Sequence, residues 1–216
     1  QYTRYRPPDQ LRFIFCLVKN CFGICFHQIS QAGVWIFLHI FFNDLPSGKA
    51  ADITGRCFSQ FLRFWPFANI IFDDAPLDQA VEGVINGIFF NQGHVCCAGS
   101  RLYVQESVFK EVVRKLKDRL ETLIVGDPMD KNTDIGAINS REQLNIINNY
   151  IKIGQQEGAE MYQSSADLPK KGFYCRPTIF TNVAQSNRIA QEEIFGPVLA
   201  IQSFRTDDEV IEKANN

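Results

Sequence analysis

Residues 69–101 read NIIFDDAPLDQAVEGVINGIFFNQGHVCCAGSR, and the expected architecture follows from this strand-and-helix unit. Its first four residues form a short apolar run closed by two aspartates, which predicts a buried strand. Asp74 is placed to cap the helix that follows, with Pro76 in the first turn. Gly93 suits a left-handed helix end. The spacing predicts one buried helical face, formed by Leu77, Ala80, Val81, Val84, Ile85, Ile88 and Phe89.

The same alternation of strands and helices continues to the end of the chain. We expect strands over 101–106, 177–183 and 198–204, and helices over 107–122 and 207–214. Ser140 and Gln143 have the spacing of a capping box, which begins a further helix carrying Leu144, Ile147 and Ile151. Alternating strands and helices predict an α/β fold with a largely parallel sheet and flanking helices.

Composition excludes several classes of protein. The chain has 216 residues, a net charge of −2 and 45% hydrophobic residues. Its near-neutral charge argues against a nucleic-acid partner, and no apolar run reaches the roughly 18–20 residues of a membrane-spanning helix. The seven cysteines are scattered and odd in number, which argues against a secreted disulfide framework. We therefore expect a cytoplasmic protein.

The chain divides near Phe67 into two segments of different character. Residues 1–67 hold seven Lys or Arg and three Asp or Glu, a charge of about +4, whereas residues 68–216 hold fifteen and twenty-one, about −6. The first segment shows neither clean helical spacing nor strand alternation. We expect residues 1–67 to be a separate N-terminal segment and residues 68–216 to form a folded unit of their own.

Cysteine is the strongest nucleophile available, and Cys96 and Cys97 lie in a glycine-flanked loop beyond a helix. Residue type alone leaves two readings open for them, a reactive thiolate or a small buried side chain. His94 invites a cysteine–histidine pair or a zinc site, but no second ligand pair is recognisable, so we expect no metal. We expect Cys175 to serve packing.

A second group of chemically capable residues is QEEIFGPV, residues 191–198. A carboxylate there can accept both hydroxyls of a ribose, and an aromatic ring can flank a planar ring. The alternative is a solvated glutamate pair before a strand. The glycine-rich phosphate-binding motifs G-x-G-x-x-G and G-x-x-x-x-G-K-[ST] are absent from the sequence.

These two segments resemble motifs of the aldehyde dehydrogenase superfamily. FFNQGHVCCAGSR, residues 89–101, resembles its active-site cysteine signature, and AQEEIFGPV, residues 190–198, resembles its downstream cofactor motif. The segments VGDPMDKNTDIGA, GFYCRPTIF and KANN follow the family in order and spacing. The resemblance covers residues 68–216.

The resemblance implies oxidation of an aldehyde to a carboxylic acid with NAD or NADP. Cys96 would be the nucleophile, passing through a thiohemiacetal and a thioester, and its backbone amide would help hold the oxyanion. Glu193 would bind the nicotinamide ribose, and Phe195 would lie near the nicotinamide. A homo-oligomer would be the family's usual form. His94 stands where the family usually has Gln.

The chain also departs from the family. Family enzymes are about twice as long, and their nucleotide-binding domain is not recognisable in residues 1–67. The position of the general-base Glu falls on Leu62, which cannot accept a proton. We therefore expect this chain alone to be inactive. The alternative is a non-catalytic family member acting as a binding or regulatory subunit, and a third reading is a residual esterase that stalls after one turnover.

Overall fold

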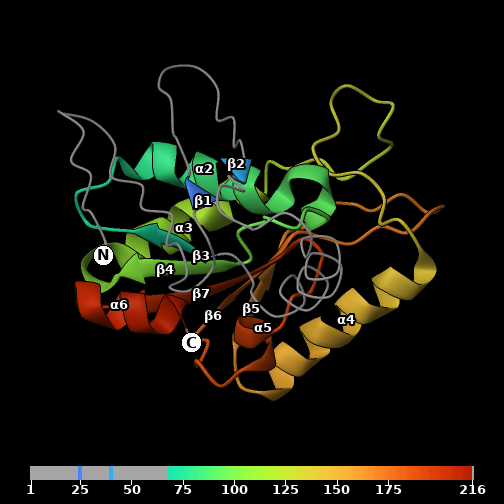
Figure 1. Ribbon diagram of the computed structural model, residues 1–216. Helices are drawn as coiled ribbons and strands as arrows, with labels where there is room; N and C mark the ends of the chain where they lie inside the picture. Colours follow the sequence, from blue (N-terminus) through green and yellow to red (C-terminus); the bar gives the residue numbers. More distant parts are fainter. Residues whose placement is uncertain (1–23, 26–38, 41–67, 216) are drawn as a thin grey trace, which may run out of the picture.

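The computed structural model describes residues 24–25, 39–40 and 68–215 (Figure 1). Two short strands, β1 (Ile24–Cys25) and β2 (His39–Ile40), pair antiparallel. Leu62 and the division near Phe67 lie outside the described residues, so the expectations attached to them stay predictions.

A five-stranded sheet forms the centre of the described chain. Its strand order is β3–β4–β7–β6–β5, and all neighbours are parallel except β5, which runs antiparallel to β6. This confirms the predicted largely parallel sheet. The strands are β3 (Ala68–Ile71), β4 (Arg101–Gln105), β5 (Glu160–Gln163), β6 (Thr178–Thr181) and β7 (Val198–Phe204).

One face of the sheet is covered by helices α2 (Leu77–Phe89) and α3 (Phe109–Leu120) (Figure 1). The predicted apolar stripe of α2 is confirmed: from Ala80 to Phe89 its members are buried, and Leu77 packs against them. They meet strand residues that point to this face, namely Ile71, Leu102, Val104, Ile179, Leu199 and Ile201.

The opposite face carries α4 (Arg141–Gln156), α5 (Arg188–Gln191) and α6 (Asp207–Ala214) (Figure 1). The intervening strand residues point this way, as the two-residue period of a strand requires. Phe180, Val198 and Ala200 contact α4 and α5, while Ile70 and Tyr103 belong to a smaller cluster with α6.

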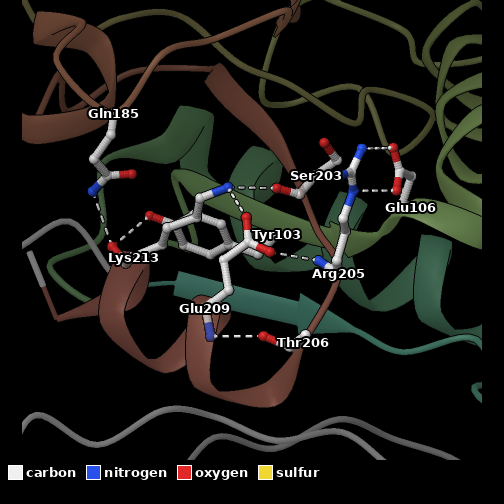
Figure 2. Close-up of polar contacts among 8 residues, drawn as sticks. All are labelled: Tyr103, Glu106, Gln185, Ser203, Arg205, Thr206, Glu209 and Lys213. Carbon is white, nitrogen blue, oxygen red and sulfur yellow. Dashed lines mark hydrogen bonds and ion pairs between the residues drawn. The ribbon is translucent and has the colours of Figure 1, made fainter.

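Helix α6 is fixed to the sheet by polar contacts at its C-terminal end, and its N-terminus is capped by its own Thr206 (Figure 2). The buried Tyr103 hydroxyl donates to the Lys213 carbonyl at 3.0 Å, and the buried Arg101 guanidinium donates to the Ala214 carbonyl at 3.2 Å. These side chains satisfy carbonyls that the last turn of a helix leaves without an intrahelical partner. At the other end, Thr206 accepts from the Glu209 N–H.

Three sequence-based expectations about elements need correction. Helix α2 begins at Leu77 and its N-cap residue is Pro76, so Asp74 is not the N-cap and Pro76 precedes the first turn instead of lying in it. The helix expected over 107–122 begins as a 3₁₀ turn over Glu106–Val108, and α3 follows from Phe109. Strand β5 and the single-turn helix α5 were not expected. Within the described residues, no helix is long and apolar enough to cross a membrane.

Candidate active site

Residues 90–100, which connect α2 to β4 and are called the cysteine loop below, begin with a sharp reversal of the backbone. Asn91, Gln92 and Gly93 are all left-handed, with φ of 49°, 58° and 74°. Such φ values are unfavourable for residues with a side chain, so the surrounding contacts must hold them. The His94 N–H donates to the Asn91 carbonyl at 2.9 Å, and the Asn91 side-chain amide donates to the His94 carbonyl at 3.1 Å. The reversal directs the following residues back toward β4.

The three cysteines of residues 68–215 differ in accessibility. Cys96 is exposed, Cys97 is partly buried and Cys175 is buried. Burial raises the pKa of the Cys97 thiol, and it raises the pKa of Cys175 to about 12. Buried thiols with raised pKa values are poor nucleophiles, because the thiolate is the reactive species. The geometry therefore favours Cys96 over Cys97 and Cys175 as a reactive group.

Cys96 and Cys97 lie in a turn that the Ala98 N–H closes by donating to the Val95 carbonyl at 2.9 Å. Within residues 68–215, the Cys96 N–H makes no recorded hydrogen bond. An exposed thiol thus sits beside a backbone donor that no other described group uses.

The two glutamates of the second motif have different surroundings. Glu192 forms an ion pair with Arg188 at 2.8 Å and accepts from the Tyr150 hydroxyl at 2.6 Å. The Arg188 guanidinium is the main cause of a lowered pKa for Glu192. Glu193 is partly buried, and burial raises the pKa of its carboxyl. Its carboxylate has no recorded partner among the described residues. Glu192 therefore serves structure, and Glu193 is available for a ligand.

The two motifs are in direct contact. The rings of His94 and Phe195 stack with centroids 5.4 Å apart and an interplanar angle of 11°. A Cβ added to Gly93 would lie 2.6 Å from the Gly196 carbonyl carbon, so the two backbones touch at a point that only glycine permits. Phe195 is itself left-handed, with φ of 55°.

The sheet explains why motifs so distant in sequence meet. The cysteine loop leads into the amino end of β4, and the second motif leads into the amino end of β7. Strands β4 and β7 are adjacent and parallel, with Arg101 opposite Ala200. The Ala200 N–H donates to the Ser100 carbonyl at 2.9 Å. Loops that enter neighbouring parallel strands at the same end must lie side by side.

Gln143, in the first turn of α4, is a site residue that sequence reasoning missed. Its N–H donates to Ser140 Oγ at 3.1 Å, which confirms the expected N-cap. Its side-chain Nε2 donates to the carbonyls of Ile194 at 3.1 Å and Phe195 at 3.0 Å. The capping-box spacing accounted for this residue locally and so concealed its contacts with the distant motif.

The side chains of the two loops are suited to bind the ribose and the adjoining ring of a dinucleotide cofactor. The partly buried Glu193 carboxylate lacks a partner among the described residues and can accept two neighbouring hydroxyl groups, as a ribose offers. Burial lowers the pKa of His94, so its ring is neutral at physiological pH and stacks on Phe195 without adding charge. Residues 68–215 contain no group of three or more His, Cys, Asp or Glu arranged to hold a metal ion.

Comparison with known proteins gives a consistent result. A model of the aldehyde dehydrogenase family matches residues 67–216. Retinal dehydrogenase 2 of Taeniopygia guttata is 51% identical over 148 residues, which cover 68% of this chain and 29% of the relative. Cytosolic aldehyde dehydrogenase 1 of Mus musculus is 44% identical over 147 residues, with the same coverage.

Solved structures give the same match. Betaine aldehyde dehydrogenase from Staphylococcus aureus in complex with NAD+ is 39% identical with a TM-score of 0.66, covering 69% of this chain and 30% of that one. An indole-3-acetaldehyde dehydrogenase in complex with NAD+ is 41% identical, also with a TM-score of 0.66. The chain thus spans about 30% of the length of the relatives it matches.

Proposed function

The chain belongs to the aldehyde dehydrogenase family, and on that premise we propose that the protein oxidises an aldehyde to a carboxylic acid with NAD+ or NADP+. The observation that carries the proposal is the contact between its two motifs. The His94–Phe195 stack and the Gly93–Gly196 contact bring the loop of the exposed Cys96 against the loop of Glu193, whose carboxylate has no partner among the described residues.

Cys96 performs the covalent chemistry in this proposal. Its thiolate adds to the aldehyde carbonyl carbon, a C–S bond forms, and the π electrons move to oxygen to give a thiohemiacetal oxyanion. The Cys96 N–H, unused by described groups, donates to that oxyanion. Loss of hydride from carbon restores the carbonyl and leaves a thioester. Water then adds to the thioester, the C–S bond breaks, and acid and thiol are released.

Glu193 and Phe195 form the cofactor side of the site. The Glu193 carboxylate would hold the ribose next to the nicotinamide by accepting its hydroxyl groups, and the Phe195 ring would pack near the nicotinamide. NAD(P)+ supplies the hydride acceptor when bound. The NAD+ complexes of the related betaine and indole-3-acetaldehyde dehydrogenases support this choice of cofactor.

The substrate is proposed only as a class, small-molecule aldehydes, because the relatives are named for aldehydes as different as retinal and betaine aldehyde. We propose a cytoplasmic location, supported by the mouse relative named as cytosolic. A family-like homo-oligomer is not proposed for this chain alone. The division into residues 1–67 and a catalytic unit over 68–216 is proposed on their difference in charge and pattern.

The test follows the first redox step and not turnover. The inactivity expected of this chain alone concerns turnover, because Leu62, at the position of the general base, cannot activate the water that releases the thioester. The protein is mixed with an aldehyde panel and excess NAD+ or NADP+, and reduced cofactor is counted per chain. We expect up to one equivalent from the wild type and from Cys97→Ala, and none from Cys96→Ala. Reduced cofactor from Cys96→Ala, or none from the wild type with any aldehyde, would contradict the proposal.

A further inference from the structure

Gln143 uses both hydrogens of its side-chain amide on one loop. Its Nε2 donates to the Ile194 carbonyl at 3.1 Å and to the Phe195 carbonyl at 3.0 Å, across more than fifty positions of sequence. Hydrogen bonds within a helix cap need only neighbouring residues. An amide that reaches two consecutive carbonyls of a distant loop instead fixes the path of that loop.

The loop that carries Phe195 needs such a contact because the backbone of Phe195 has an unfavourable conformation. Phe195 has φ of 55°, a left-handed conformation that a bulky side chain rarely adopts. A residue with this conformation persists only when its surroundings determine it. The two bonds from Gln143 lie directly on the peptide groups before and after the Phe195 Cα, so they act at the strained residue itself.

Helix α4 contacts the same loop at a second point, where Ile147 packs against Gly196. A Cβ added to Gly196 would lie 2.6 Å from Cδ1 and Cγ1 of Ile147, one turn beyond Gln143 on α4. On its other side the Gly196 carbonyl lies against Gly93. The loop is thus held between the first two turns of α4 and the cysteine loop.

The cysteine loop is attached to the same support. The Gln92 side-chain amide donates to the Ala137 carbonyl at 3.0 Å, and Ala137 lies in the segment that leads into α4. Residues 137–147 therefore bind both loops, one through Gln92 and the other through Gln143.

We propose that Gln143 is a positioning residue: its two hydrogen bonds hold the loop that carries Glu193 and Phe195 in register with the cysteine loop. Its consequence for catalysis rests on the proposed function, because the positioned groups are then those that hold the cofactor. Gln143 acts through the backbone of that loop, and it needs no contact with the aldehyde or with Cys96.

The test uses Gln143→Met, which keeps the length of the side chain, carries no charge and has about the same helix propensity, but has no donor. Gln155→Met makes the same change at an exposed position on the same helix and serves as the matched control. Gln143→Glu is a second variant, since an acidic residue in the first turn favours the helix while both donors are removed.

Two readouts on the full chain require neither cofactor nor turnover. Amide exchange at Val198, which donates to the Gly196 carbonyl, is expected to become about tenfold faster in Gln143→Met and in Gln143→Glu. The NMR-measured pKa of His94 is expected to rise toward its ordinary value in Gln143→Met, because a released Phe195 no longer helps to bury the ring. Gln155→Met is expected to change neither.

A third readout concerns the cofactor. The concentration of NAD+ that gives half-maximal burst rate is expected to rise about tenfold in Gln143→Met, whereas alkylation of Cys96 by iodoacetamide without cofactor stays within about twofold of wild type. Unchanged exchange at Val198 and an unchanged His94 pKa in Gln143→Met would overturn the inference. Absence of any Cys96-dependent burst in the wild type would overturn the proposed function instead, and the exchange result would still decide the role of Gln143.

Discussion

At the scale of single residues, the adjacent carboxylates of Glu192 and Glu193 are expected to affect the stability of the fold in opposite directions at neutral pH. Burial raises the pKa of Glu193, so the native state binds this proton more tightly than the unfolded chain. Stability from this group is therefore fully present below the unfolded pKa and is lost as the pH rises through the native pKa. At neutral pH an ionised, partly buried carboxylate without a described partner opposes folding.

Glu193→Gln is accordingly expected to raise the melting temperature slightly at about pH 7.5, and to give no gain at about pH 4, where the wild-type carboxyl is protonated. The same variant should bind cofactor more weakly, a common conflict between stability and function. Thermal unfolding of both proteins at the two pH values checks this. A lower melting temperature for Glu193→Gln at neutral pH would contradict it.

Glu192→Gln is the matched control one position earlier. Its pKa is lowered by Arg188, so its stabilising effect is present above the unfolded pKa and is lost as the pH falls through the native one. Removing the charge should lower the melting temperature at neutral pH by about 1–3 °C, the range expected for an exposed ion pair. The two variants should therefore shift stability in opposite directions.

The sequence identified some site residues and could not identify others. Cys96, Glu193 and Phe195 follow from local motifs, and the roles given to them stay predictions. Gln143 was assigned only to a helix cap, because nothing near it in sequence indicates the carbonyls of Ile194 and Phe195. Such contacts depend on the order of strands in the sheet, which local spacing does not contain.

At the scale of elements, the contact between the two loops depends on Gly93. Gly93→Ala places a Cβ against the Gly196 backbone and requires an alanine at φ of 74°. Gly158→Ala meets the same conformational penalty at φ of 88°, but no atom lies within 4 Å of the added Cβ. Comparison of the two variants therefore separates the energetic cost of a left-handed alanine from the cost of the clash between the two loops.

We expect Gly158→Ala to lower the free energy of unfolding by about 1 kcal/mol, and Gly93→Ala by at least about 2 kcal/mol more. Gly93→Ala should also slow acylation of Cys96, since the loop must move. Urea unfolding and thiol acylation measure both effects. Equal losses of stability in the two variants would show that the loops do not touch as described.

Helices and strands were predictable from the sequence where their buried residues recur at the regular spacing of a helix or a strand. The stripe of α2 and the bounds of β7 and α6 agree with expectation, because long apolar patterns bury a defined face. Strand β5 was not predicted because its residues EMYQ lie at the edge of the sheet and are not buried, so the sequence there shows no hydrophobic alternation. Helix α5 has only four residues, too few for a helical pattern.

At the scale of the whole molecule, the described chain ends in a helix anchored on the central sheet (Figure 2). The Tyr103 hydroxyl accepts from Arg101 at 3.2 Å and donates to the Lys213 carbonyl at 3.0 Å, and Tyr103 is fully buried. Tyr103→Phe should cost about 1–2 kcal/mol, or about 3–8 °C in melting temperature. It should leave Cys96 reactivity unchanged, because these contacts join β4 to α6 and none of them involves the turn over residues 95–98 that carries Cys96.

Tyr162→Phe is the control for that prediction. The Tyr162 hydroxyl donates to Glu121 at 2.6 Å in a more exposed setting, so water can replace the lost bond and the cost should be smaller. A larger loss of stability for Tyr162→Phe than for Tyr103→Phe would contradict the role given to the buried tyrosine in holding α6.

The central claim is that Cys96 is the nucleophile of a site formed by the meeting of two loops, and acylation without cofactor tests it most directly. The chain is treated with p-nitrophenyl acetate, and the acetylated residue is located by peptide mass spectrometry. The account predicts one acetyl group on Cys96, released slowly because Leu62 cannot act as a base. A label on Cys97 or Cys175 with Cys96 unmodified, or no label at all, would contradict it.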